Sequence, residues 1–299
     1  MATPFVATLA DRAVLTAEGP DTSRFLQGLI TADVGRIDSG RAAYAALLTP
    51  QGKILFDFFV VKAGERYLID CAADRAGELL KRLMFYRLRA KVDLAADEVL
   101  AVAALWNGTT ADEPGNVREV AGGVAFADPR TPAMGSRVIA PAEAIAAFAG
   151  SLGAQAASAA DYHAHRIALG LADSADIGSG ELFPHECNFD QIGGVDFRKG
   201  CYVGQEVVSR TEHRGTARKR IVPAVFDGGA PERGSAVTAG ERAIGEVMSV
   251  AGDRGLVLVR LDRAEAAIAA GAPLTAGGAT LRLERPDWAR FEVPGVEAA

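Results

Sequence analysis

The sequence contains little cysteine: three residues in a chain of 299, at positions 71, 187 and 201. Three widely spaced cysteines cannot build the disulfide framework of a small secreted domain, and their odd number leaves at least one thiol unpaired within the chain. The first residues also lack a basic segment followed by a long apolar one, which is the pattern of a secretory signal. We therefore expect a protein of a reducing compartment and place it in the cytoplasm.

Long apolar runs and an excess of positive charge are missing as well. Charge or glycine interrupts each apolar window before the roughly 20 residues that a membrane helix needs, so we expect no membrane association. A net charge of −6 argues against a protein that coats nucleic acid, because phosphate neutralisation requires clustered Lys and Arg. With 49% hydrophobic and 23% charged residues, the composition is that of a globular protein of two or three domains, without a direct nucleic-acid partner.

The order of the predicted elements indicates an α+β protein. Apolar alternation and turn residues predict strands at 3–18, 42–61 (a hairpin), 67–70, 99–105 and 117–126. Helical spacing predicts helices at 22–29, 74–92, 140–160 and 161–169, and another after Gly204. The basic face of the helix over 74–92 is expected to be solvated. After a boundary near 215–220, short strands separated by glycine predict a small β-barrel or sandwich.

Cys201 has surroundings that suit a reactive thiol. It follows Arg198, Lys199 and Gly200 and precedes the expected helix, so positive charge and the helix dipole would favour its thiolate. The alternative is that a lone cysteine packs as a small buried hydrophobic residue. The residues alone leave both interpretations open.

Two carboxylates stand among apolar neighbours. Asp57 interrupts the apolar strand Ile54–Val60, where a carboxylate lies either at a sheet edge or in a ligand-facing pocket. Glu186 lies between Phe183 and Phe189, and a carboxylate bracketed by aromatic rings suits a planar heterocycle with N–H donors. An ordinary exposed loop acid is the other interpretation of Glu186.

The histidines give weaker signals. His185, Cys187 and Cys201 form an imaginable metal site, but their spacing matches no zinc signature and no fourth ligand is evident, so no metal site is predicted. His163 and His165 stand two apart on a helix and therefore point in different directions, which is typical of surface or interior histidines. No nucleophile elbow or phosphate-binding loop appears.

The octet Lys199–Glu206, Lys-Gly-Cys-Tyr-Val-Gly-Gln-Glu, resembles the signature of the YgfZ-type folate-binding proteins. These are relatives of the glycine-cleavage aminomethyltransferase, or T-protein. Four further segments resemble motifs of the same family, so that the resemblance covers nearly the whole chain: 25–34, 49–57, 182–190 and 237–240.

The resemblance implies three lobes in a ring around a central hole that binds tetrahydrofolate or a one-carbon derivative. The first lobe would consist of residues 1–45 and about 140–215, the middle lobe of about 46–139, and the C-terminal β-barrel of about 216–299.

The resemblance also implies roles for individual residues. Asp57 would assist catalysis near the folate nitrogen, Glu186 would contact the pterin ring, and Cys201 would be the functional thiol. We add three residues of the octet, Lys199, Tyr202 and Gln205, to the expected cofactor-binding set.

Transferases of the family lack the octet, whereas the YgfZ type carries it and is linked to assembly or repair of iron–sulfur clusters, with effects on tRNA-thiolating enzymes. The resemblance therefore implies a folate-binding maintenance protein rather than a classical enzyme, with iron–sulfur proteins or assembly factors as partners. Three alternatives remain: an aminomethyltransferase-type enzyme of one-carbon transfer, a folate-dependent demethylase or other one-carbon enzyme on the same scaffold, and a binding module without chemistry. Whether Cys201 ligates a metal or acts as a redox thiol stays open.

Overall fold

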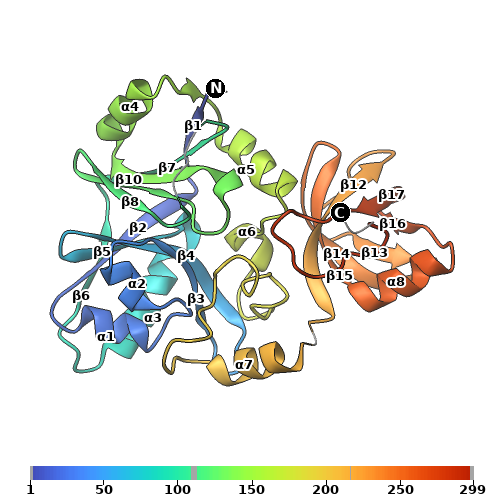
Figure 1. The fold of residues 1–299 in the computed structure, drawn as a ribbon, viewed down its shortest axis with the longest axis horizontal. Helices are drawn as coiled ribbons and strands as arrows, with labels where there is room; N and C mark the ends of the chain where they lie inside the picture. Colours follow the sequence, from blue (N-terminus) through green and yellow to red (C-terminus); the bar gives the residue numbers. More distant parts are fainter. Residues whose placement is uncertain (1–2, 109–112, 216, 297–299) are drawn as a thin grey trace.

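The computed structural model describes residues 3–108, 113–215 and 217–296. Their strands form two sheets and a closed barrel (Figure 1). The first sheet has the order β11-β1-β7-β10-β9-β8, with bounds β1 Phe5–Thr8, β7 Leu100–Trp106, β8 Val117–Val120, β9 Gly123–Ala127, β10 Ser136–Pro141 and β11 Gln155–Ala156. The second has the order β3-β4-β5-β2-β6, with bounds β2 Arg12–Glu18, β3 Ala43–Leu48, β4 Ile54–Ala63, β5 Arg66–Ala72 and β6 Asp93–Asp97.

The two sheets pack face to face and share the largest core. Many of its apolar side chains come from one face of each sheet, for example Phe59 and Val61 of β4 and Val102 and Ala104 of β7, and others come from the segment 162–208 and from the barrel. The alternate residues of β4, such as Phe58, pack on the other side against α1 (Thr22–Gln27), α2 (Val34–Asp38) and α3 (Ala76–Arg87). Since both faces of β4 are covered, its sequence is a nearly continuous apolar run.

Of the remaining helices, α4 covers the outer face of the first sheet, α5 to α7 lie between the sheets and the barrel, and α8 packs on the barrel itself (Figure 1). Their bounds are α4 Ala142–Ser151, α5 Ala159–Ala168, α6 Ser174–Ile177, α7 Gln205–Arg214 and α8 Leu261–Ala269, with short 3₁₀ turns η1 Ala73–Arg75 and η2 Pro132–Met134. A reciprocal capping box between Ser158 and Asp161 starts α5. In Figure 1, α6 and α7 lie between the sheets and the barrel.

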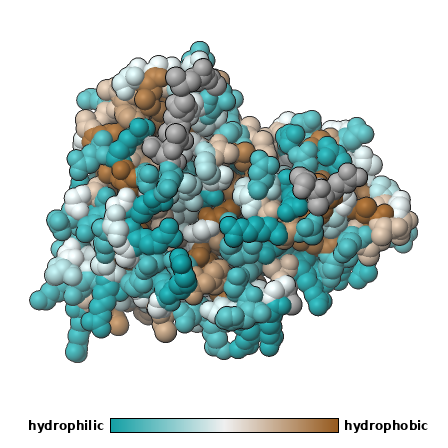
Figure 2. Space-filling model, viewed as in Figure 1, coloured by the Kyte–Doolittle hydropathy of each residue, from teal (hydrophilic) through white to brown (hydrophobic). Residues whose placement is uncertain are grey.

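The C-terminal part confirms the expected β-barrel. Six antiparallel strands close in the order β12-β15-β14-β13-β16-β17, with bounds β12 Lys219–Asp227, β13 Ala236–Ala239, β14 Arg242–Ala251, β15 Arg254–Arg260, β16 Leu274–Ala276 and β17 Ala279–Leu283. The indole N–H of Trp288 donates to the carbonyl oxygen of Leu169, 2.8 Å away, and so joins the end of the chain to α5. On the face in Figure 2 most of the surface is hydrophilic, and hydrophobic residues show mainly in its recesses.

The structure differs from the sequence-based expectation in several elements. Helix α8 and strands β6, β10 and β16 were not expected, and the helix expected over 140–160 is only α4, followed by the short strand β11. The helix expected over 74–92 ends at Arg87, because Leu88 has a positive φ of 47°. The expected lobe boundary at residue 46 falls inside β3, and β2 pairs with strands of the expected middle lobe. The division into lobes stays a prediction.

Candidate functional site

Lys199 fixes the loop of residues 198–204 to the end of α1 and to the segment that follows it. Its ammonium nitrogen donates to the carbonyl oxygens of Gln27, Ile30 and Ala32, at 2.9, 2.6 and 2.8 Å. Carbonyl groups at the end of a helix lack partners within it, and an ammonium has three donors to offer them. Burial lowers the pKa of Lys199 to about 8. The first residue of the octet therefore holds the loop in place.

Cys201 is exposed on this loop, whereas Cys71 and Cys187 are buried. Burial raises the pKa of Cys71 to about 12 and that of Cys187 well above the usual range. Because the thiolate is the nucleophile and the metal ligand, the two buried thiols are unsuited to either task. The expected help from a helix dipole is not seen: α7 begins only at Gln205, and the dipole acts mainly within the first turn.

Gly204 of the octet lies against the turn of the β3–β4 hairpin. It has a φ of +81°, and a Cβ at this position would lie 2.4 Å from the carbonyl oxygen of Thr49. Both the backbone conformation and the close approach therefore require glycine. The octet and the 49–52 turn, two segments expected to belong to one family pattern, are in direct contact.

The other octet residues expected to bind a cofactor contact the protein itself. The backbone N–H of Tyr202 donates to Oε1 of Gln205 at 3.0 Å, and the Tyr202 ring lies 5.0 Å from the Lys199 ammonium. Burial raises the pKa of Tyr202 to about 12. These contacts shape the loop that presents Cys201, and direct contact of Lys199, Tyr202 and Gln205 with a cofactor stays a prediction.

Asp57 is buried with a hydrogen bond to each carboxylate oxygen. Its Oδ2 accepts from the hydroxyl of Tyr44 at 2.8 Å, and its Oδ1 accepts from Oγ of Ser174 at 2.6 Å. Burial raises the pKa of Asp57, although Arg12 and these hydrogen bonds act in the opposite direction. Asp57 is thus an interior carboxylate, and its expected catalytic role stays a prediction.

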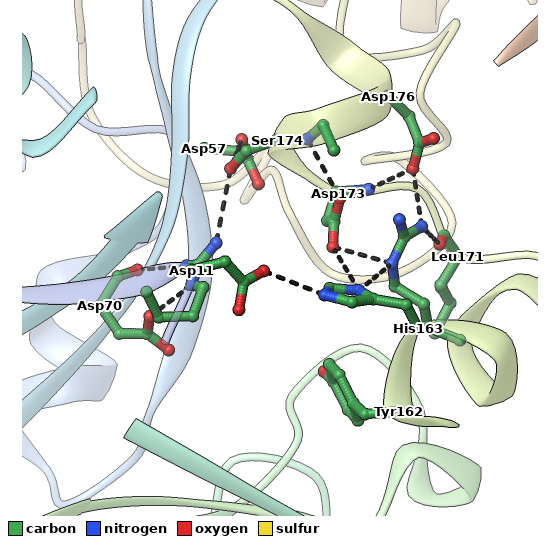
Figure 3. Close-up of polar contacts among 12 residues, drawn as sticks. Asp11, Asp57, Asp70, Tyr162, His163, Leu171, Asp173, Ser174 and Asp176 are labelled. Carbon is green, nitrogen blue, oxygen red and sulfur yellow. Dashed lines mark hydrogen bonds and ion pairs between the residues drawn. The ribbon is translucent and has the colours of Figure 1, made fainter. Parts of the chain in front are cut away.

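Asp57 belongs to a buried polar network, part of which Figure 3 shows, between the two sheets and α6. Asp70 accepts from Nε of Arg12 and from Nη1 of Arg137, both at 2.6 Å. Arg137 also lies near Asp128, with 4.0 Å between Nε and Oδ2. Sequence reasoning missed Asp70, although it interrupts an apolar strand as Asp57 does, which was the available signal.

The two histidines of α5 point in different directions, as expected. Nε2 of His163 lies 2.9 Å from Oδ2 of Asp11 in the network of Figure 3. His165 stacks on Trp106 instead, and burial lowers its pKa. Neither belongs to the Cys201 loop.

Glu186 borders a cavity of about 340 Å³ between the Phe183 segment, α7 and the barrel. Its Oε2 accepts from the backbone N–H of Phe183 at 2.9 Å, and both residues line the cavity together with Lys219. Asp57 does not line it. Within the described part of the chain, the cavities found do not combine the two carboxylates that the resemblance assigned to folate.

His185 lies near carboxylates rather than near thiols. Among the described residues, its ring nitrogen is within 4.8 Å of carboxylate oxygens of Asp190 and Glu212, whereas Cys187 and Cys201 are not in the group. Arg220 already pairs with both oxygens of Asp190, at 2.9 and 2.8 Å. A guanidinium in that place opposes a bound cation.

Known proteins resemble this chain in sequence. A family model described as the CAF17 C-terminal β-barrel domain matches residues 218–291. The human iron–sulfur cluster assembly factor IBA57 is 34% identical over 273 residues, which are 84% of this chain and 76% of the human protein. The chain belongs to the IBA57 family. A relative from Pyricularia oryzae is also 34% identical, over 85% of this chain and 71% of its own length.

The IBA57 relatives differ in length. A homologue from Neurospora crassa is 35% identical over 75% of this chain, which spans only 54% of that protein. The expected resemblance is confirmed at the level of the IBA57 family, and the narrower YgfZ type stays a prediction. The cytoplasmic location is contradicted, since these IBA57 relatives are named mitochondrial.

The fold of this IBA57-family chain matches that of a transferase. The aminomethyltransferase T of the glycine cleavage system from Bartonella henselae superposes with a TM-score of 0.74 over 96% of this chain and 87% of its own, at 16% identity. This confirms the expected aminomethyltransferase-like α+β fold with a C-terminal barrel. Among the described residues, no helix is long and apolar enough to span a membrane.

Proposed function

We propose that this protein acts in the assembly or repair of iron–sulfur clusters through the thiol of Cys201. The observation that carries the proposal is the contrast between one exposed cysteine on a fixed loop and two buried ones. Membership of a family whose curated members are named iron–sulfur cluster assembly factors supports it. The carbonyl contacts of Lys199 hold the loop in one place, so the thiol is presented without large rearrangement.

The chemistry follows from the thiolate. Cys201 loses its proton and its sulfur then binds iron, as a soft ligand. A cluster is generally held by four protein ligands, most often cysteine thiolates. With a single accessible thiol, this chain supplies one of them, and a partner protein supplies the others. The partners are therefore iron–sulfur proteins or assembly factors, and tRNA-modifying iron–sulfur enzymes benefit indirectly.

Folate binding is the second part of the proposal. The cavity beside Glu186 has a volume within the range of small-molecule sites, and Phe183 offers an aromatic surface next to a carboxylate. A carboxylate that accepts one backbone N–H keeps acceptor capacity for the N–H groups of a pterin. The residues present therefore fit the flat ring of tetrahydrofolate, whose bound form would position a partner or a one-carbon group.

Complementation tests the thiol. In cells without their own homologue, Cys201→Ser is expected to lower the activity of a [4Fe–4S] enzyme at least about tenfold relative to the wild type, because serine is a poor ligand for iron. Cys71→Ala is the matched control, since Cys71 is buried, and it should retain activity. Full activity of the cluster enzyme with Cys201→Ser would contradict the proposed role of this thiol.

Calorimetric titration with 5-formyltetrahydrofolate tests the cavity separately. Glu186→Gln is expected to weaken binding about tenfold, as the loss of a charged hydrogen-bond acceptor does. The exposed Glu181→Gln should bind like the wild type. If the wild type does not bind, the folate part fails while the thiol part stands.

A further inference from the structure

The C-terminal end of α3 places large apolar side chains in solvent. Met84, Phe85 and Leu88 are 44%, 71% and 86% exposed. The described part of the chain has only seven exposed large apolar residues, so three within five positions form a cluster rather than a scatter. The basic face of the helix predicted over 74–92 was expected only to be solvated.

Positive charges surround this cluster. Lys81 and Arg82 precede Phe85 by one helical turn, and Arg89 and Lys91 follow it, all exposed. In the described part of the chain none of these four has an acidic partner within 4.0 Å, while the one acid of α3, Glu78, pairs with Arg75 at 3.0 Å. We call Lys81, Arg82, Phe85, Leu88, Arg89 and Lys91 the basic–apolar patch. It is a local concentration of cations in a chain with a net charge of −6.

The backbone of the patch is strained. Leu88 has a φ of 47° and a ψ of −109°, a region that leucine rarely occupies. Such a conformation destabilises the fold, and burial does not offset this because the side chain is in water. The strained backbone places the apolar side chain of Leu88 in solvent, where it contributes nothing to the stability of the fold.

A cavity of about 370 Å³ lies beside the patch, lined by Lys81, Arg82 and Phe85 together with Leu55 and Phe56 of β4. Arg75 holds the strand that forms one wall of this cavity. The Arg75 guanidinium donates to the carbonyl oxygen of Leu55 at 3.0 Å and lies 4.4 Å from the centre of the Phe56 ring. The cavity is therefore held by a strand and a helix, which are rigid elements.

We propose that the basic–apolar patch docks an acidic protein partner, which inserts an apolar side chain into this cavity. Carboxylates of the partner would pair with the four cations, and its apolar residues would cover Phe85 and Leu88. The cavity is concave, and its apolar residues Leu55, Phe56 and Phe85 lie among charged side chains that include Glu78, which favours a protein side chain over the flat surface of a bilayer. Apolar side chains between the cations argue against phosphate backbones, which need charge alone. The docking is independent of Cys201 and of folate.

Fluorescence anisotropy of the full chain tests this, with a short labelled peptide of alternating glutamate and leucine as the probe. The wild type is expected to bind it at low salt, and K81E/R82E and F85S/L88S are each expected to bind at least about tenfold more weakly. The matched controls are R242E/R282E on the barrel and V99S, which changes an equally exposed apolar residue. Both should bind like the wild type.

Three outcomes would overturn the proposal. The first is that the patch variants bind the peptide as well as the control variants do. The second is that the wild type does not bind the peptide. The third is that the wild type does not bind the peptide but floats with phosphatidylcholine–phosphatidylserine vesicles, and that the patch variants do not. The last would assign the patch to a membrane surface. Hydrogen exchange supplies a readout that does not depend on variants: the bound peptide should protect the amides at the end of α3.

Discussion

The ammonium nitrogen of Lys199 lies 2.6 Å from the carbonyl oxygen of Ile30, although 169 positions separate the two residues in the chain. This contact joins the loop of Cys201 to the segment after α1, the first helix of the fold. The octet therefore depends on the N-terminal part of the chain for its shape. A change at Lys199 should affect both stability and the presentation of the thiol.

Replacing Lys199 by methionine should lower the free energy of unfolding by about 2–4 kcal/mol, because three carbonyl groups lose their donor. Lys199→Arg should retain only part of this stability, since a planar guanidinium cannot donate hydrogen bonds in the same three directions as an ammonium group. Urea unfolding followed by circular dichroism measures both. An unchanged midpoint in Lys199→Met would show that the three contacts contribute little.

The octet contains a matched pair of glycines for a second prediction. Gly204→Ala places a Cβ 2.4 Å from the carbonyl oxygen of Thr49 at a positive φ, whereas a Cβ at Gly200 meets nothing within 4 Å. We expect Gly204→Ala to lower the free energy of unfolding by about 3 kcal/mol and Gly200→Ala by less than about 1 kcal/mol. Equal losses in thermal unfolding would contradict the assigned contact.

Local patterns predicted much of this fold. The hairpin of β3 and β4, helix α7 after Gly204 and the C-terminal barrel follow from periodicity, from turn residues at 49–52 and from glycine spacing, all of which act over a few residues. Helix α8 was missed because its Ala-rich sequence was assigned to a region of short strands. The octet, through its resemblance to the YgfZ-type signature, singled out Cys201 before any geometry was known, and the role of this thiol stays a prediction.

The polar interior was harder to predict, since its partners are distant in sequence. Asp57 meets Ser174 across 117 positions, and Arg137 meets Asp70 across 67. A sequence shows that a carboxylate in an apolar strand needs a partner, but not which one. The same reasoning applies to Lys199, whose carbonyl partners lie 167 to 172 positions away in the chain.

Alkylation should separate the three thiols. Iodoacetamide at neutral pH is expected to label one cysteine in the native chain, Cys201, because the other two are buried. Raising the pKa of Cys71 from 9.0 to about 12 lowers its thiolate fraction by about three powers of ten. The native Cys201→Ser variant should therefore stay unlabelled on the same timescale. Once it is unfolded in guanidinium, iodoacetamide should label its two remaining thiols, Cys71 and Cys187. Mass spectrometry counts the labels, and prompt labelling of native Cys201→Ser would contradict the assignment.

The buried pair of Asp128 and Arg130 should make stability depend on pH. Burial alone would raise the pKa of Asp128, but Arg130, which donates to both carboxylate oxygens at 3.0 and 2.7 Å, holds it below 3.8. A carboxyl group with a lowered pKa in the folded state stabilises the fold fully above its unfolded pKa and loses that contribution as pH falls through the folded pKa.

Asp128→Asn should consequently lower the free energy of unfolding by about 3–5 kcal/mol at pH 7, because Arg130 is left as an unpaired buried charge. The difference from the wild type should begin to shrink below about pH 4, where the carboxyl group of the unfolded chain takes up its proton, and should shrink further as the pH falls through the lowered pKa of the folded protein. Urea unfolding of both proteins at a series of pH values from neutral to acidic measures this difference. A difference that stays constant across the series would show that the charge of Asp128 contributes nothing, and would leave only the shape of its side chain as the reason for the loss.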